Sequence, residues 1–220
     1  MGTILAPAVK NRARFRVHAI LPLAVLEAMR HLDSPRDEEA AEYVDEHLKK
    51  RLGLSDTVAA QITRYEVAAR RNQGIAEAEF EQILRLAGRR TDAALVFGDG
   101  GRRAGRRALG RLLPPTRWAA RRLPGVLRRA VGFRAARRCA REVLGVTLSR
   151  EGRGAIAIVA DPVSVRATPD GAACAFYAAA LAELLRQLMH FDGGMVHRAC
   201  RAHGAARCEW RAAVPSRRTK

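Results

Sequence analysis

The chain has 220 residues and a formal net charge of +18, and 48% of its residues are hydrophobic. That apolar fraction supports a packed core and excludes a wholly disordered chain, and the length suits one domain with or without a helical extension. No apolar run reaches the roughly 18 residues that a membrane-spanning helix needs. The segment Met1–Lys10 has no charged stretch ahead of an apolar one, so we expect no signal peptide and a cytoplasmic protein.

The excess positive charge is concentrated in one segment. Residues 1–101 hold 15 basic and 15 acidic side chains, residues 102–141 hold 14 arginines and no acid, and residues 142–220 hold 11 basic and 7 acidic side chains. Such a block attracts acidic partners, anionic surfaces or acidic ligands. It is also consistent with a solvated helix face whose arginine stems lie on apolar surface, and the arginine bias itself is typical of a high-GC genome.

The first part of the chain has helical patterns separated by turns. Apolar residues at helical spacing predict a helix over Val17–Leu32, which Asp33-Ser34-Pro35 ends. Further helices are predicted over 36–52, over Asp56–Arg71 after a Ser55 cap, over Ala76–Leu86, and from Thr91 through Ala108, with a turn at Asn72-Gln73-Gly74. Pro114, Pro115 and Pro124 divide the rest of the arginine-rich segment into short helices. We therefore expect an N-terminal part that is all helix.

The pattern changes after Gly145. The short apolar run Ala155–Ala160 predicts a buried strand, and the broad apolar stripe of Ala173–Met189 predicts a long helix. Two more strands are predicted over Met195–Ala202 and Arg207–Val214, joined by a turn at His203-Gly204-Ala205. The expected fold class is α+β, with N-terminal helices and a small antiparallel sheet packed with helices.

Four residues of metal-ligating type occur in the C-terminal part: Cys174, His197, Cys200 and Cys208. Three thiolates and one imidazole suit tetrahedral Zn²⁺, with Zn–S bonds of about 2.3 Å. Cys174 begins the predicted long helix, where the helix dipole favours the thiolate, and the last two cysteines flank the hairpin turn. Residues 197 and 200 face opposite sides of a regular strand, so a shared site requires a bulge.

The remaining candidates define the alternatives. Four cysteines are too few for a disulfide framework, and without a metal they are expected to be buried thiols that pack as small apolar residues. Cys139 lies outside the group and is not expected to bind metal. His190 and His203 are the alternative imidazole ligands if the hairpin register differs by a few residues.

The C-terminal part resembles the C-terminal half of the 4-vinyl reductase domain, over roughly residues 155–212. The signature of that family is a cysteine before a helix, an acidic residue, two spacers, a cysteine, a small loop with glycine and a further cysteine. Here the spacings are 23 residues from Cys174 to His197, 3 to Cys200 and 8 to Cys208. In the sensory members these positions bind structural zinc. His197 stands where the pattern has glutamate, and histidine is an equally good zinc ligand.

The family includes bacteriochlorophyll 4-vinyl reductase proteins of phototrophs and the sensory domains of phenol-responsive bacterial activators. The resemblance implies a pocket, enclosed by helices against the sheet, for a hydrophobic or aromatic molecule such as a phenol or a tetrapyrrole. Phe97, Trp118 and Phe133 are candidates to line it or to pack as core, and the arginine pairs are candidates to bind ligand carboxylates. The expected organisation is a helical segment 1–88, a ligand-binding domain 89–214 and a basic tail 215–220. We expect a homodimer.

Two alternatives to a carrier or sensor remain. The first is a vinyl reductase of bacteriochlorophyll synthesis, but Gly98-Asp99-Gly100-Gly101 follows a helix-like run, so it is not the phosphate-binding turn of a hydride cofactor site. The second is a DNA-binding regulator, because residues 38–51 and 52–65 resemble a helix-turn-helix, with Thr57, Gln61 and Arg64 facing the groove. DNA is the less expected partner, since the local charge is neutral and DNA readers carry a basic footprint.

Overall fold

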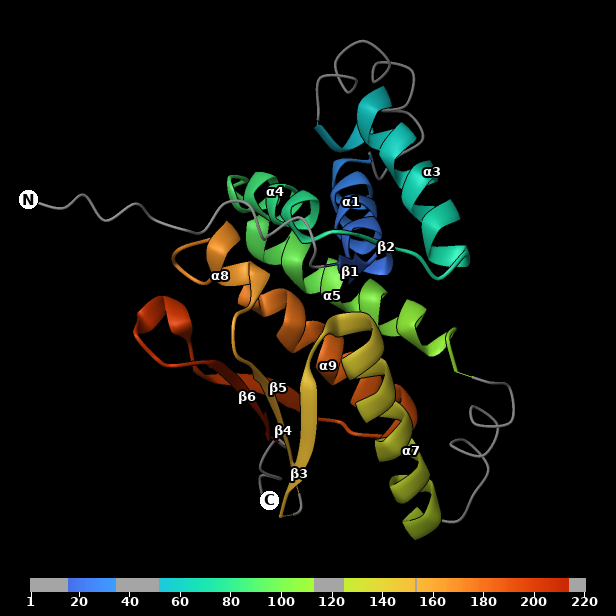
Figure 1. Cartoon of the computed structure of the whole chain (residues 1–220), viewed down its shortest axis with the longest axis vertical. Coiled ribbons are helices and arrows are strands. Elements are labelled where there is room, and N and C mark those ends of the chain that lie inside the picture. Colours follow the sequence, from blue (N-terminus) through green and yellow to red (C-terminus); the bar gives the residue numbers. More distant parts are fainter. Residues whose placement is uncertain (1–15, 35–51, 113–124, 153, 214–220) are drawn as a thin grey trace, which may run out of the picture.

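The computed structural model describes residues 16–34, 52–112, 125–152 and 154–213 (Figure 1). The elements of its first part are β1 (Arg16–His18), α1 (Ile20–Asp33), α3 (Asp56–Arg70), β2 (Gly74–Ala76), α4 (Glu77–Gly88), α5 (Ala93–Leu109) and α7 (Gly125–Cys139). After a π-helical turn at Ala140–Leu144 follow β3 (Thr147–Glu151), β4 (Gly154–Val159), α8 (Val163–Ala167), α9 (Cys174–Met189), β5 (Gly194–Ala199) and β6 (Cys208–Ala213).

The strands form two antiparallel sheets. One has four strands in the order β3-β4-β6-β5, and β1 pairs with β2 in the other. The predicted α+β fold class is confirmed. The strand expected over Ala155–Ala160 is β4, the helix expected over Ala173–Met189 is α9, and the two expected C-terminal strands are β5 and β6.

The helices are stacked in layers on the four-stranded sheet (Figure 1). The apolar stripe of α9 is buried, including Phe176, Leu181 and Leu184, and α9 contacts both β5 and α5. On its other side α5 contacts α1, an almost wholly buried helix. The buried side chains form one continuous hydrophobic core that includes residues on both sides of position 88. The division of the chain at 88/89 stays a prediction.

Glycines allow α5 and α9 to pack closely. A Cβ on Gly101 would lie 2.3 Å from the Phe176 carbonyl oxygen, and one on Gly105 would lie 2.8 Å from the Ala180 carbonyl oxygen. The two glycines are four residues apart and so lie on the same face of α5. Gly101 and Gly105 thus serve helix packing, and the run Gly98 to Gly101 lies inside α5.

A buried ionic network holds the end of α1. Asp33, which is 4% exposed, accepts two hydrogen bonds from Arg90, at 2.7 and 2.9 Å. It also accepts the backbone N–H of Gly53 at 2.8 Å, and Arg90 donates further to Asp92 at 2.7 Å. Because the Asp33 carboxylate is fully paired, its burial is compatible with a stable fold. This contact joins α1, the 3-10 turn at Leu52–Leu54 and the α4–α5 loop.

The expectation of an all-helical N-terminal part is wrong. Val17 pairs with Ile75 in the small sheet of β1 and β2, so the helix predicted from Val17 begins only at Ile20. Strand β3 and helix α8 were also not predicted. These elements are three or five residues long, which is too short for a hydrophobic period to be visible.

Some expectations fall outside the described residues: the helix over 36–52, the segment with Pro114, Pro115 and Pro124, the side chain of Trp118 and the tail 215–220. Within the part of the chain that the structure describes, no helix is both long enough and apolar enough to cross a membrane.

Candidate metal centre

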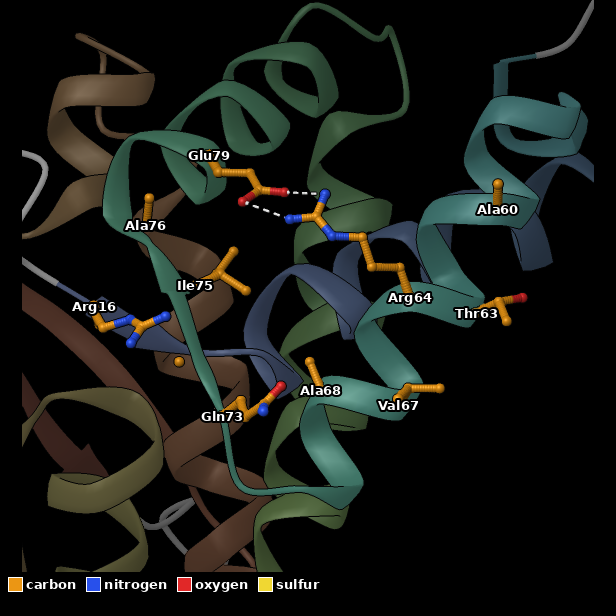
Figure 2. Close-up of a pocket in the computed structure, with 11 residues that line it drawn as sticks. Arg16, Ala60, Thr63, Arg64, Val67, Ala68, Gln73, Ile75, Ala76 and Glu79 are labelled. Atoms are coloured by element: carbon orange, nitrogen blue, oxygen red, sulfur yellow. Dashed lines mark hydrogen bonds and ion pairs between the residues drawn. The ribbon is translucent and has the colours of Figure 1, made fainter.

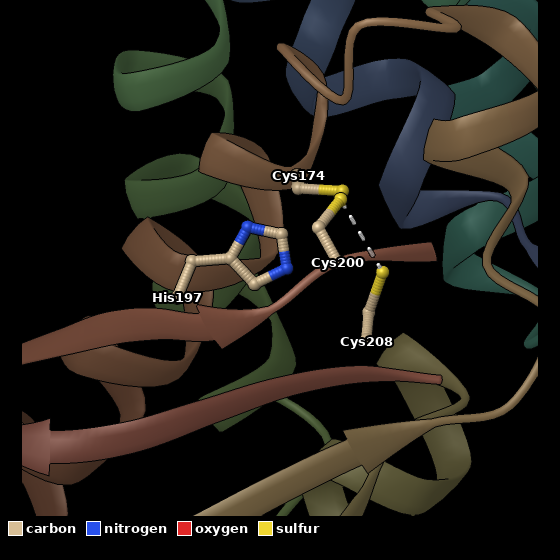
Figure 3. A group of neighbouring side chains, drawn as sticks. All are labelled: Cys174, His197, Cys200 and Cys208. Atoms are coloured by element: carbon tan, nitrogen blue, oxygen red, sulfur yellow. Dashed lines mark hydrogen bonds between the residues drawn. The ribbon is translucent and has the colours of Figure 1, made fainter. Parts of the chain in front are cut away.

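Cys174, His197, Cys200 and Cys208 meet between the start of α9 and the β5–β6 hairpin (Figure 3). Their potential ligand atoms, three Sγ and one imidazole nitrogen, all lie within 4.8 Å of one another. The three cysteines are buried and the histidine is half-buried. The cluster can therefore hold a metal ion with residues from two elements that are far apart in the sequence.

A bulge in β5 brings His197 and Cys200 to the same side. His197 is opposite Trp210 in β6, whereas Ala199 is opposite Glu209, so Arg198 is an extra residue in the ladder. A regular strand would point residues 197 and 200 to opposite faces. Because the bulge adds one residue to β5, His197 and Cys200 point to the same side, which a shared site requires.

The sulfur spacing matches metal coordination and excludes a disulfide. The Sγ atoms of Cys200 and Cys208 are 3.9 Å apart, and both residues are free thiols. A disulfide has an S–S distance of about 2.05 Å. Two sulfurs bound tetrahedrally at Zn–S distances of about 2.3 Å are about 3.8 Å apart. The distance between the Sγ atoms of Cys200 and Cys208 therefore already suits a shared zinc ion.

The His197 ring is fixed with one nitrogen toward the sulfurs. It stacks on Trp210 with ring centroids 4.7 Å apart and an interplanar angle of 10°. Burial, followed by the neighbouring charge of His203, lowers the pKa of His197. A backbone hydrogen bond at Ala199 raises this pKa but does not outweigh them. The Nε2 of His197 is buried and has no hydrogen-bond partner among the described residues. A neutral imidazole whose Nε2 has no other partner is the form that ligates a metal.

The sulfurs have supporting polar groups of the kind that surround metal thiolates. The Oγ of Ser164 lies 3.2 Å from the Sγ of Cys174, and the backbone N–H of Arg201 donates to the Sγ of Cys208 at 3.3 Å. Gly171 adopts a φ of +77°, and a Cβ there would come within 2.9 Å of the Sγ of Cys200. Glycine is thus required both by the backbone conformation and by the space next to the sulfur.

Two thiols of the cluster, those of Cys174 and Cys208, have a raised pKa. Burial, followed by the nearby Cys208 and Cys200, raises the pKa of Cys174 well above its usual range, although the Ser164 hydrogen bond opposes this. Burial also raises the pKa of Cys208. At Cys174 burial therefore outweighs the preference of a helix start for a thiolate. A bound cation is needed to hold several thiolates this close together.

The other candidate ligands lie elsewhere. Cys139 is buried at the end of α7, where its Sγ donates to the Ala108 carbonyl oxygen at 3.5 Å. His203 is in the 3-10 turn after β5, and His190 ends α9 in a left-handed conformation. Neither histidine belongs to the cluster in the described part of the chain.

The reactivity of Cys139 should report its burial. Burial raises the pKa of this thiol to about 11, from 9.0 when exposed. The stability that the fold gains from keeping the Cys139 thiol protonated is therefore present below pH 9.0 and is lost as the pH rises toward 11. We expect peptide-resolved alkylation to leave Cys139 unmodified in the folded protein at about pH 8 and to modify it readily in urea. Equal rates in the folded and unfolded protein would contradict this.

The described part of the arginine-rich segment is mostly helical, in α5, α7 and the start of the π-helical turn. Arg102 and Arg103 pair with Asp99, and Arg107 pairs with Glu27. Five arginines have no ion pair with any described residue: Arg111, Arg129, Arg134, Arg137 and Arg141. Among the described residues, the acids of the N-terminal helices therefore do not pair with these five arginines.

A pocket of about 610 Å³ lies between α3, β2 and α4 (Figure 2). Arg64 of α3 reaches across the pocket and forms a 2.8 Å ion pair with Glu79 of α4. Its guanidinium also lies over the ring of Tyr65. In the helix-turn-helix interpretation Arg64 faces DNA, but here it is held by α4. The first helix of that motif lies outside the described residues.

The expected pocket residues have different environments. Phe97 is 0% exposed and packs in the core. Phe133 lines two adjoining pockets beside α7. The sequence did not identify Arg150, Ser164 or Trp210 as functional, because their partners become neighbours only through β3, α8 and the sheet register.

Comparisons with models of known protein families, with curated proteins and with solved structures find no match.

Proposed function

We propose that the chain is a zinc-stabilised protein of the 4-vinyl reductase type that binds a small hydrophobic or aromatic molecule, as a carrier or sensor. One observation carries the proposal: the four residues at the family's zinc spacing have their ligand atoms within 4.8 Å of one another. Spacing in sequence alone does not bring a helix start to a hairpin. The fold and the bulge in β5 do so here.

Zinc is the metal that this ligand set favours. Thiolate sulfurs select soft or borderline metals, and three sulfurs with one imidazole form a common structural zinc set. Four protein ligands fill a tetrahedral site, so no position is left for a reacting water. The metal would therefore hold the start of α9 to the β5–β6 hairpin, and it would not itself take part in a reaction.

The cluster would fix a helix that reaches a pocket. Cys174 is at the first turn of α9, and Leu185 and Met189 at its other end line a pocket of about 280 Å³. Attaching α9 to the sheet at one end limits its movement over the sheet at the other. The proposed role of zinc is thus to hold the α9 residues that line the ligand pocket in a fixed position.

Metal analysis and cobalt substitution test the proposal. We expect about one zinc per purified chain, and Co²⁺ exchange should give the intense sulfur-to-cobalt charge-transfer absorption of a thiolate site. The matched control is Cys139→Ala, which removes a buried thiol outside the cluster and should leave both results unchanged. A protein purified without metal that neither takes up Zn²⁺ nor shows this absorption with Co²⁺ would overturn the proposal.

The same preparation separates a carrier from a reductase. Incubation with divinyl chlorophyllide and a chemical reductant tests for turnover. Binding without conversion is expected for the carrier or sensor. Conversion would support the vinyl reductase and leave the metal assignment intact.

A further inference from the structure

A pocket of about 280 Å³ lies between α7, the C-terminal end of α9 and the β3–β4 turn. Its volume is near the lower limit of about 300 Å³ for small-molecule sites. It is lined largely by apolar side chains: Phe133, Ala155, Leu185, Met189, Phe191 and Ala212. Gly152, Gly154 and the two arginines Arg129 and Arg150 make up the rest of the lining. The pocket thus combines an apolar wall with two cationic groups.

Arg150 is held in place at this pocket. Its guanidinium carbon lies 4.8 Å from the centroid of the Phe133 ring, and its Nη2 donates to the Arg129 carbonyl oxygen at 3.2 Å. These contacts fix the planar fork before any ligand arrives, so little side-chain entropy remains to be lost on binding.

No described acid neutralises this cation. Glu151, the next residue in the chain, pairs with Arg211 at 3.0 Å instead. Among the described residues neither Arg150 nor Arg129 has an ion-pair partner. A guanidinium with free donors beside an apolar cavity provides a site for an anion attached to an apolar group.

The positive charge continues along α7. A second pocket of about 400 Å³ shares Phe133 and Arg150 with the first and adds Arg134 and Arg137. Arg129, Phe133 and Arg137 are four residues apart on the helix and so lie on one face. This face thus places a cation on each side of Phe133, Arg129 at the first pocket and Arg137 at the second.

We propose that this pocket binds a small hydrophobic carboxylic acid, with its apolar body against Phe133, Leu185 and Met189 and its carboxylate on the fork of Arg150. The inference rests on the proposed ligand-binding function and names its ligand class. A singly charged carboxylate matches the planar guanidinium through two parallel hydrogen bonds. A doubly charged phosphate would lose more hydration beside the apolar wall, which favours the carboxylate.

Three probes with the same eight-carbon chain test the ligand class: octanoate, octan-1-ol and octylamine, by isothermal titration calorimetry on the full chain. We expect octanoate to bind at least about tenfold more tightly than octanol, because a charge-assisted pair adds to the same apolar contact. Octylamine should bind most weakly, because its ammonium group meets Arg150. Equal affinities for octanoate and octanol would overturn the carboxylate assignment while leaving an apolar pocket.

Variants locate the site. Arg150→Gln should weaken octanoate binding about tenfold or more and leave octanol binding unchanged. Ala212→Phe should block both probes by filling the cavity, since Ala212 lines it. The matched control is Arg70→Gln, which removes an exposed arginine of α3 far from the pocket. Unchanged octanoate affinity in Arg150→Gln, or no binding of any probe to the parent protein, would overturn the proposal.

Zinc content is measured in every sample. A failed octanoate experiment with about one zinc per chain rejects the acid pocket alone. Absence of zinc rejects the proposed function itself, so the two failures are distinguishable.

Discussion

Cys208→Ser is expected to abolish stoichiometric zinc binding and to lower the free energy of unfolding by several kcal/mol, because binding free energy at a structural zinc site contributes directly to folding. Cys208 is 0% exposed, and its sulfur is 3.9 Å from that of Cys200. A serine hydroxyl is shorter and is a much poorer zinc ligand, so three ligands would remain on a metal that needs four. Urea unfolding and metal analysis of the same samples measure both effects.

The control for this variant is Cys139→Ser, which changes another buried thiol. It should keep about one zinc per chain and lose only about 1 kcal/mol, because it affects one weak hydrogen bond. A strong chelator should lower the melting temperature of the parent and of Cys139→Ser, but not that of Cys208→Ser. If Cys208→Ser retained its zinc and melted with the parent, the cluster would not be a metal site.

Gly101→Ala is expected to destabilise the protein by about 1–3 kcal/mol or more, the range for overpacking a tight interface. The new methyl group would lie 2.3 Å from the Phe176 carbonyl oxygen and 2.7 Å from the Cβ of Ala179. Backbone atoms cannot rotate away as a side chain can, so α5 and α9 must separate. Because α9 carries Cys174, we also expect weaker zinc retention in the presence of a chelator.

Gly98→Ala on the same helix is the matched control. A Cβ there meets only the Nη1 of Arg102, at an ordinary 3.7 Å. Alanine stabilises a helix interior by roughly 0.5–1 kcal/mol relative to glycine. The two variants should therefore shift the urea midpoint in opposite directions. Shifts of the same sign and size would show that α5 does not pack on α9 through Gly101.

The sequence predicted the elements with a strong hydrophobic period. Helix α9 has apolar residues over four turns, and β4 is an apolar run rich in Ile and Val, so both were found within a residue or two. Strand β3 was missed because of its five residues only Leu148 is buried. Its pairing with β4 is a tertiary effect that residue propensity does not encode.

The four cluster residues could be predicted because their chemistry and spacing are visible in the sequence. The bulge that makes them converge could be stated as a requirement, but its place at Arg198 depends on the pairing of β5 with β6. The arginine-lined pocket could not be predicted at all. It needs the unpredicted strand β3 to carry Arg150 onto Phe133 of α7. The charge block predicted an anion site without indicating which arginines form it.

X-ray absorption at the zinc K-edge of the purified protein reports the ligands of the metal. We expect a first shell of three sulfurs at about 2.3 Å and one nitrogen at about 2.0 Å. We also expect His197→Ala to lose the nitrogen component and keep the sulfurs. A shell dominated by oxygen or nitrogen, or a spectrum unchanged in His197→Ala, would contradict a site made by Cys174, His197, Cys200 and Cys208.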